Sequence, residues 1–352
     1  MSEGTSPKQI LVTYADNPAK LLLALPVFQA LRTAYPGAKI TAFVTAGVEG
    51  MIGGLPSIDR VESFSKKESL FRLEGRFRAM GADACLHLSP SPRMVLAAWL
   101  AKIPLRIGSD YKWHALFLTR AEKINRAVSD RNEVEYNLDL LKSLEIQKLP
   151  SKIDFPIPEE AKNRVRERLQ QKGLASTTPY VLVHPGSKGG ARHWKTERFG
   201  QLIGHLCQIK GLRVVITAEA DETTLVAEVT AFLYSLPLEQ KPVVVVTGDL
   251  TLKELGALCQ GALCVLTGPT GPLYLAAAVG APTVAIFSPA PEATPDRWGP
   301  WGNENTVLIP KGSQCPACQV GYCKKHDPMD VLTVPEVFEA MKSYIRKAVT
   351  VD

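Results

Sequence analysis

Two segments in the second half of the chain, residues 180–199 and 267–280, carry residue types that suit a diphosphate ligand. Each begins with an apolar run, continues with a turn rich in Gly, Ser or Thr, and ends in a helical pattern. Such a turn directs backbone N–H groups and the positive end of a helix dipole toward one point, which favours bound phosphate. We therefore predict that the two turns hold one diphosphate from two sides.

Cationic and hydroxyl side chains complete this predicted diphosphate site. Ser187, Lys188 and Arg192 lie in the first turn, and the two cations match the charge of a pyrophosphate. The alternative is that Ser187 caps the following helix while the two cations face solvent. The candidates in the second turn are Thr270, Gly271, Pro272 and Leu273.

Three positions are candidates for contacts with the nucleoside. Glu222 follows the apolar run 212–216, and an acid after the second strand of such a unit commonly accepts hydrogen bonds from ribose hydroxyls. A carboxylate that complements the dipole of the next helix explains Glu222 equally well. Thr247 and Gly248 end the next apolar run and are expected to border the base.

The candidates for catalysis lie near the N-terminus. Asp16 follows the apolar run 10–14, and its carboxylate is a candidate general base, although an Asp before a helical run is equally a common helix cap. Lys20 lies near the start of the same helical run, where a cation faces the positive end of the dipole. We expect Lys20 to bind a phosphate or carboxylate of the donor or acceptor.

Acceptor contacts are expected in the first half of the chain. Ser89, Ser91 and Arg93 follow the apolar run 84–88, and the carboxyl ends of strands are where such sheets bind ligands. Arg120 is a further cation that could bind an anionic ligand, with a plain surface role as its alternative.

The cysteines divide into two groups. Cys85, Cys207, Cys259 and Cys264 lie in apolar runs and are expected to be core thiols. The second group has the spacing of a weak metal-site candidate, but zinc sites usually have a second, separated ligand pair. Free thiols, or a disulfide formed on oxidation, are the favoured interpretation, and no cofactor is expected. The second group is Cys315, Cys318, Cys323 and His326.

Composition bounds the class of protein. The 352 residues are 45% hydrophobic and 22% charged, as in an ordinary soluble globular protein, and no apolar run is long enough to span a membrane. The N-terminus lacks the apolar core of a secretory signal, so a cytoplasmic location is expected. The net charge of +6 favours an anionic substrate or membrane surface as partner, and no motif supports nucleic acid. The basic run 162–168 is expected to be a solvated helix face.

Apolar runs alternate with amphipathic segments along both halves of the chain, which predicts an α/β fold with parallel, doubly wound sheets. A polar, proline-bearing stretch at 145–178 separates the halves. We expect an N-terminal acceptor-binding domain at 1–160, a C-terminal nucleotide-sugar domain at 175–330, and a last helix at 331–352.

Several segments together match the pattern of a known family. They include residues 10–12, 25–36 and 135–141, then His184-Pro-Gly-Ser187 with His193, Trp194 and Phe199, then residues 270–280 and the cysteine group before the last helix. In these segments the chain resembles glycosyltransferase family 9, the heptosyltransferases of lipopolysaccharide core assembly.

The resemblance implies a GT-B fold, in which two Rossmann-like domains face each other across a cleft and the last helix crosses back to the first domain. It implies inverting, metal-independent transfer of a heptose or related sugar. The donor would be ADP-heptose or a similar nucleotide-diphosphate sugar, and the acceptor a lipopolysaccharide core or other cell-envelope glycan. Peripheral contact with the inner membrane would follow.

The chain departs from the family pattern at two places. Lys20 stands where the family usually has Asp, whereas Asp16 matches an acidic position found in one branch. Pro269 and Tyr274 replace an acid and a histidine of the usual donor loop. These departures leave a second hypothesis open, namely a catalytically impaired relative that binds nucleotide or glycan. A sugar-nucleotide epimerase of similar architecture is a third hypothesis, but no suitable acid–base pair stands out.

Overall fold

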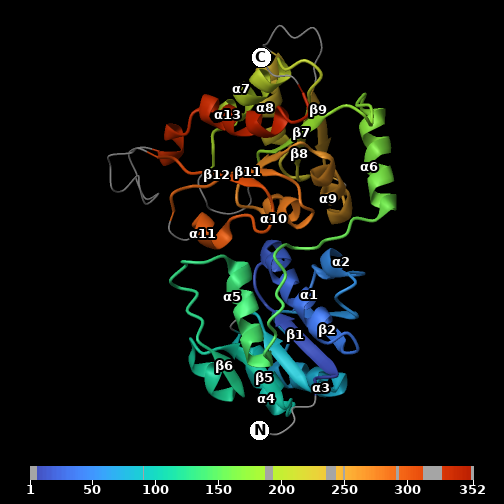
Figure 1. The fold of residues 1–352 in the computed structure, drawn as a ribbon, viewed down its shortest axis with the longest axis vertical. Coiled ribbons are helices and arrows are strands. Elements are labelled where there is room, and N and C mark those ends of the chain that lie inside the picture. Colours follow the sequence, from blue (N-terminus) through green and yellow to red (C-terminus); the bar gives the residue numbers. More distant parts are fainter. Residues whose placement is uncertain are drawn as a thin grey trace. The chain divides into compact units, whose positions relative to one another are not determined.

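The computed structural model divides the chain into two compact units, Met1–Asp154 and Phe155–Asp352, and each is described here by itself (Figure 1). The structure describes residues 6–89, 91–186, 193–234, 243–248, 250–290, 293–311 and 327–349.

The first unit is built on a six-stranded parallel sheet with the order β3-β2-β1-β4-β5-β6. The central strands are continuous apolar runs because helices cover both faces of the sheet (Figure 1). β1 lies at its centre, where Ile10 pairs with Ile40 on one side and with Ala84 on the other. The strands are β1 (Gln9–Tyr14), β2 (Lys39–Thr45), β3 (Arg60–Phe64), β4 (Ala84–His87), β5 (Leu105–Ser109) and β6 (Arg120–Glu122).

The helical pattern expected after the first strand divides into a 3-10 helix and an α-helix. Asn17 begins the 3-10 helix, and its side chain accepts a hydrogen bond from the Ala19 N–H at 2.9 Å. The helices of the first unit are η1 (Pro18–Ala24), α1 (Leu25–Ala34), α2 (Glu49–Ile52), α3 (Leu70–Met80), α4 (Pro92–Leu100), η2 (Trp113–Phe117), α5 (Glu133–Asp139) and η3 (Leu140–Leu144).

The second unit repeats the same topology in a second parallel sheet, with the order β12-β11-β10-β7-β8-β9. In both sheets the order reverses at the centre, between β1 and β4 in the first and between β7 and β10 in the second. Ligands of such folds bind beyond the carboxyl ends of the strands at this switch point. The strands are β7 (Tyr180–His184), β8 (Arg213–Ala218), β9 (Val243–Thr247), β10 (Val265–Thr267), β11 (Thr283–Ile286) and β12 (Asn305–Leu308).

The last helix, α13, packs within the second unit. Its apolar residues Val337, Met341 and Ile345 are buried in one core cluster with residues of α7, which it contacts side by side (Figure 1). The helices of this unit are α6 (Glu159–Gln171), α7 (Thr196–Cys207), α8 (Thr223–Tyr234), α9 (Leu252–Gly261), α10 (Gly271–Ala278), α11 (Pro295–Trp298), η5 (Pro328–Val331) and α13 (Val334–Ile345).

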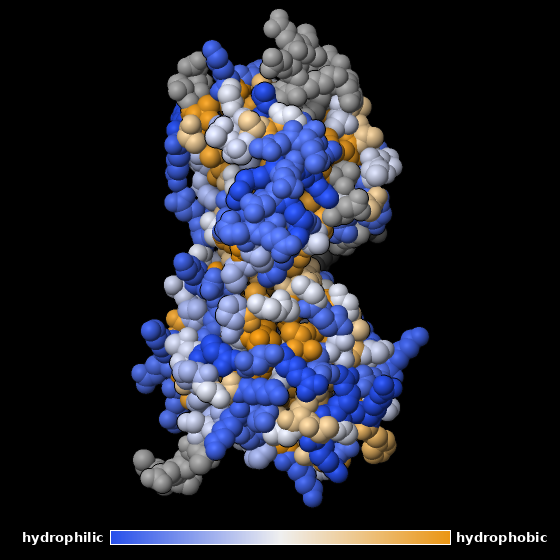
Figure 2. Space-filling view, turned by 90° about the vertical axis from the view of Figure 1, so that its right-hand side faces the viewer, coloured by the Kyte–Doolittle hydropathy of each residue, from blue (hydrophilic) through white to orange (hydrophobic). Residues whose placement is uncertain are grey.

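The basic run at 162–168 lies on α6, whose outer face is hydrophilic (Figure 2). Val165 and Leu169 are buried toward α9, while Lys162 pairs with Glu159 and Arg164 with Glu160. The prediction of a solvated helix face is therefore confirmed. Among the described residues, no helix is both long and apolar enough to cross a membrane.

The predicted core thiols are also confirmed. Cys85, Cys259 and Cys264 are buried, and Cys207 is partly buried. Burial raises the pKa of Cys207, Cys259 and Cys264 to about 12. These thiols therefore remain protonated at neutral pH and serve packing rather than nucleophilic chemistry.

Candidate functional site

A cavity of about 360 Å³ lies at the carboxyl ends of β7, β8 and β9, beside the first turn of α10. Its position is the switch point of the second sheet, and its volume is in the range of small-ligand sites. Leucine side chains give the cavity apolar walls, while Glu219 and the histidine supply polar groups. The lining residues are His184, Thr217, Ala218, Glu219, Ala220, Gly248, Leu250, Leu252, Leu255, Gly271 and Pro272.

Gly248 shapes one wall of this cavity. It follows β9 with φ +58°, a left-handed backbone conformation that glycine adopts at little cost. The structure therefore brings Gly248 to the predicted nucleoside region. The backbone of Thr247 ends β9 beside it, and the Thr247 side chain lies outside the described residues.

The first turn of α10 offers fewer backbone donors than its sequence suggests. Gly271 and Pro272 line the cavity, but proline has no N–H, and the Leu273 N–H donates to the Thr270 carbonyl oxygen at 3.0 Å. The Leu273 side chain is also fully buried. Thr270 precedes the helix, and its hydroxyl lies 3.3 Å from that of Thr267. Gly271 is thus the backbone donor that the first three residues of α10 present.

Glu222 lies at the rim of the same region but does not line the cavity. Its carboxylate accepts a hydrogen bond from the Glu219 N–H at 2.9 Å and lies against Gly186, just beyond β7. A Cβ atom on Gly186 would overlap that carboxylate, so a larger residue there would require the Glu222 side chain to shift. Of the two acids, Glu219 lines the cavity, and sequence reasoning missed it although it directly follows β8.

His184 is buried at the end of β7, where Nδ1 lies 3.2 Å from the Thr217 hydroxyl. Burial lowers the pKa of His184, and the nearby carboxylates of Glu222 and Glu219 oppose this effect in part. The side chain is buried and also forms part of the cavity wall.

Several predicted residues lie outside the part of the chain that the structure describes. They are Ser187, Lys188 and Arg192 of the expected diphosphate turn, and Cys315, Cys318, Cys323 and His326 of the cysteine group. Elsewhere, across the described ranges, no cluster of three or more His, Cys, Asp or Glu side chains could hold a metal ion.

In the first unit, Asp16 is exposed on the loop between β1 and η1. Its side chain accepts a hydrogen bond from the Asn17 N–H at 2.8 Å. Since Asn17 and not Asp16 caps η1, the capping alternative does not explain this acid. Lys20 is half-buried in η1, and its N–H donates to the Asn17 carbonyl oxygen at 3.0 Å.

Ser89, a predicted acceptor residue, makes a structural hydrogen bond within the first unit. It is 8% exposed, and its hydroxyl oxygen accepts a hydrogen bond from the Ala15 N–H at 2.7 Å. This bond spans the switch point of the first sheet, from the residue after β1 to the end of β4. Ser89 therefore holds the loop that carries Asp16.

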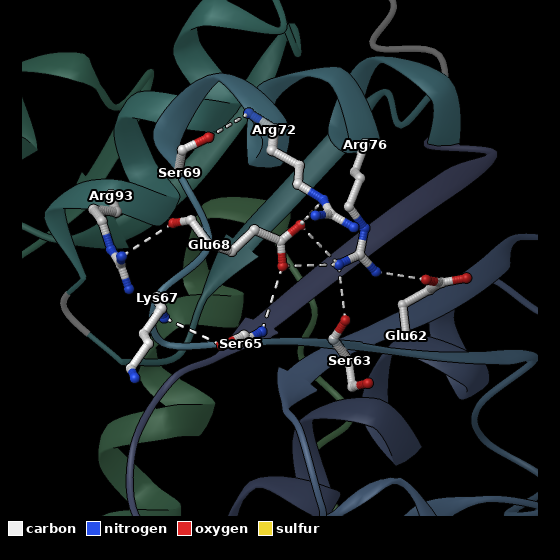
Figure 3. A network of polar contacts seen from close by, with 9 residues as sticks. All are labelled: Glu62, Ser63, Ser65, Lys67, Glu68, Ser69, Arg72, Arg76 and Arg93. Atoms are coloured by element: carbon white, nitrogen blue, oxygen red, sulfur yellow. Dashed lines mark hydrogen bonds and ion pairs between the residues drawn. The ribbon is translucent and has the colours of Figure 1, made fainter.

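The remaining predicted acceptor residues are dispersed. Arg93, on α4, donates to the Glu68 backbone oxygen at 3.1 Å, at the margin of the network in which Arg76 joins Glu62 and Glu68 (Figure 3). Ser91 precedes α4 without a side-chain capping bond. Arg120 begins the edge strand β6, level with Leu86, and is not brought to the end of β4. The strand β5 lies between β4 and β6, so Ser89 follows and Arg120 begins strands that are not neighbours.

A buried polar network, missed by the sequence analysis, supports the same end of the first sheet. Arg126 pairs with Glu133, and it donates to the Leu88 carbonyl oxygen and the Asn137 side chain, both at 3.0 Å. Asn137 in turn donates to the Leu23 carbonyl oxygen of η1 at 3.2 Å. The network thus ties β4, η1 and α5 together around the loop of Asp16. Its partners are 11 or more residues apart, except for the Arg126–Glu133 pair, so no local motif revealed it.

The profile of glycosyltransferase family 9 (heptosyltransferase) matches residues 70–327 of the chain. Lipopolysaccharide heptosyltransferase 3 of Escherichia coli is 24% identical over 294 residues, which are 80% of this chain and 83% of that protein.

Two solved structures resemble the fold over almost the full length of each chain. One is a family 9 glycosyltransferase from Veillonella parvula DSM 2008, with a TM-score of 0.81, 22% identity, and coverage of 97% of this chain and 98% of that chain. The other is E. coli ADP-heptose lps heptosyltransferase II, with a TM-score of 0.76, 20% identity, and coverage of 96% and 99%. The two Rossmann-like units are thus those of the GT-B fold.

Proposed function

The chain belongs to glycosyltransferase family 9 (heptosyltransferase), and we propose that it transfers a heptose or related sugar to a lipopolysaccharide core or another cell-envelope glycan. The names of the relatives described above support this chemical class, because one is a lipopolysaccharide heptosyltransferase and another carries ADP-heptose in its name. The proposed donor is accordingly ADP-heptose or a similar nucleotide-diphosphate sugar. The reaction proposed is inverting and needs no metal ion.

The cavity in the second unit is the observation that carries this proposal. Its apolar walls suit a nucleoside base, and Glu219 and Glu222 are the acids near its ribose side. Gly271 at the start of α10 presents a backbone N–H toward a phosphate. Lys188 and Arg192, which follow β7 in the sequence, are the proposed cations for the diphosphate.

In the proposed reaction, an acceptor hydroxyl oxygen attacks the anomeric carbon of the donor. The bond between that carbon and the diphosphate oxygen breaks, and its electron pair leaves with the nucleoside diphosphate. The proton of the acceptor hydroxyl passes to the Asp16 carboxylate. Lys188, Arg192 and the Gly271 N–H stabilise the charge of the departing diphosphate, and Lys20 binds a phosphate or carboxylate of either substrate.

Asp16 is proposed as the base because it is exposed, because it does not cap η1, and because Ser89 holds its loop. The protein is proposed to act at the cytoplasmic face of the inner membrane, where a lipid-linked acceptor is available.

Calorimetry with ADP, UDP and ADP-heptose, followed by a transfer assay, tests the proposal. We expect ADP and ADP-heptose to bind, and Asp16→Asn to lower the transfer rate by about 10²- to 10⁴-fold with ADP affinity unchanged. Lys20→Ala should weaken substrate affinity or slow transfer, and an unchanged affinity and rate would remove it from the site. Absence of binding to any nucleoside diphosphate would overturn the proposal.

A second candidate function is a nucleotide- or glycan-binding module without transferase activity. The residue types at Lys20, Pro269 and Tyr274 favour it, and Tyr274 is 1% exposed, so its side chain belongs to the core of α10. Tight ADP-heptose binding without turnover on any acceptor tested would favour this function over transfer.

A further inference from the structure

The first unit exposes a group of large apolar side chains at one place in the fold. Among the described residues, four of the eight exposed large hydrophobic side chains fall within residues 99–116. They are Trp99 (45% exposed), Tyr111 (52%), Trp113 (62%) and Leu116 (86%), and we call them the aromatic surface. Single exposed apolar residues are ordinary, whereas a contiguous group marks an interaction site.

Phe117 joins two members of the aromatic surface, Trp99 and Trp113. Its ring centroid lies 4.9 Å from that of Trp99 on α4 and 6.4 Å from that of Trp113 on η2. The η2 segment is anchored to the sheet, because Arg106 on β5 donates to the Phe117 carbonyl oxygen at 2.7 Å. The exposed rings are therefore presented on a fixed scaffold of α4, η2 and β5.

Cations border the aromatic surface. Lys102 follows α4, where its N–H donates to the Trp99 carbonyl oxygen at 2.9 Å, and Lys112 directly precedes Trp113; both are exposed. Residues 99–123 contain five Lys or Arg and two acids, Asp110 and Glu122, so the segment has a net charge of 5 − 2 = +3. An anionic partner complements this segment.

We propose that the aromatic surface docks the protein on an anionic lipid bilayer. Tryptophan and tyrosine combine an apolar ring with a polar group and prefer the headgroup level of a membrane. Leu116 is placed to enter the acyl region, while Lys102 and Lys112 reach anionic headgroups. The mixture of aromatic rings with flanking lysines fits lipid better than a second protein surface, whose core is depleted of lysine.

The position of Tyr111 connects this surface with the acceptor end of the sheet. Its N–H donates to the Ser109 hydroxyl at 3.3 Å, at the carboxyl end of β5. Asp16 and Ser89 follow strands that end at the same edge of the parallel sheet. Trp99 and Phe117 lie near the first residues of β5, because Arg106, the second residue of that strand, donates to the Phe117 carbonyl oxygen and the two rings contact each other. The aromatic surface therefore extends away from that edge, and the docking does not rest on the proposed function.

Co-sedimentation of the full chain with phospholipid vesicles tests the docking. The vesicles are phosphatidylcholine alone, or phosphatidylcholine with about one third phosphatidylglycerol. We expect stronger binding to the anionic vesicles and weaker binding at high salt. The double variant Trp113→Ser, Leu116→Ser should lower the partition coefficient about tenfold or more, and Lys112→Glu about fivefold.

Matched control variants lie elsewhere in the same unit. Phe71, on α3, is 78% exposed, and Phe71→Ser should leave vesicle binding unchanged. Lys66 is exposed beside the opposite edge strand, β3, and Lys66→Glu should also have little effect. Equal losses in the control variants, or no vesicle binding by the wild-type chain, would overturn the proposal.

Light scattering tests whether a second copy of the chain, and not a bilayer, covers the aromatic surface. A wild-type dimer that the Trp113→Ser, Leu116→Ser variant converts to a monomer would assign the surface to a second copy of the chain and overturn membrane docking. ADP calorimetry on the same variant separates the two proposals. Lost vesicle binding with retained ADP binding supports docking, whereas failure of ADP to bind the wild-type chain removes the donor site alone.

Discussion

The two units share one strand order but differ at the carboxyl ends of their central strands. In the first unit, polar groups cross the switch point and bind each other, as in the Ser89–Ala15 bond and the pairing of Arg126 with Glu133 and Asn137. In the second unit, glycines and leucines line the corresponding edge, and a cavity of about 360 Å³ lies there.

This difference shows how one topology serves two tasks. The polar network of the first unit holds a loop that carries an exposed acid, Asp16, which is the base in the proposed reaction. Gly248 and Gly271 at the cavity of the second unit allow a ligand to approach the backbone closely. The strand order decides where a site forms, and the side chains at that edge decide its chemistry.

Among the variants that test this comparison, Arg126→Met in the first unit is expected to have the largest effect. Glu133 would remain buried without its cation, and removal of one partner of a buried ion pair costs about 3 kcal/mol of unfolding free energy. Urea unfolding measures this loss. The control is Arg131→Met, because Arg131 is 42% exposed and pairs with Asp139 at the surface, where the cost is at most about 1 kcal/mol. Equal losses in both variants would contradict a special role for the network.

Gly186→Ala, in the second unit, is expected to have the next largest effect. The added Cβ would displace the Glu222 carboxylate from the Glu219 N–H, and Glu219 lines the cavity. Loss of about one hydrogen bond predicts roughly tenfold weaker ADP binding by calorimetry.

The double variant Gly186→Ala, Glu222→Ala sharpens the Gly186→Ala experiment. It removes the overlap and should not bind ADP more weakly than Glu222→Ala alone. Gly37→Ala is the matched control, since a Cβ there meets no atom within 4 Å. ADP affinity unchanged by Gly186→Ala would show that the close approach does not shape the ligand site.

The smallest effect expected concerns pH and the buried histidine at each switch point. Burial lowers the pKa of His87, at the end of β4, to about 3, far below the ordinary value of 6.5. Below pH 6.5 the unfolded chain binds a proton at position 87 that the folded chain does not bind. The free energy of unfolding is therefore unaffected by this group above pH 6.5 and falls as the pH falls from 6.5 toward 3. The expected slope is at most about 1.4 kcal/mol per pH unit.

Urea unfolding at pH 7.5, 6.5 and 5.5 measures that slope. His87→Gln should reduce it, and His205→Gln, at an exposed position on α7, should leave it unchanged. Identical slopes for the wild-type chain and His87→Gln would contradict a neutral, buried His87. In the second unit, the carboxylates near His184 raise its pKa against the effect of burial, so His184→Gln should change the slope less.

The sequence by itself predicted the central strands of both sheets and also the edge strand β9, because these strands are continuous apolar runs. It did not reveal β3, β6 or β12. All three are edge strands, whose residues are partly exposed and therefore lack that apolar signal. The sequence also predicted the helix α6, because its buried residues Val165 and Leu169 lie one helical turn apart among charged residues.

For the candidate site, the sequence determined which turns follow buried strands and which residue types stand in them. Those facts placed Gly248, Gly271, Pro272 and the neighbourhood of Glu222 correctly at the carboxyl edge of the second sheet. Only the tertiary structure decided that Ser89 binds a backbone N–H, that Leu273 faces the core and that Arg126 meets Asn137. The physical reason is that hydrogen-bond partners and burial depend on residues far away in the chain, whereas strand and turn patterns are local.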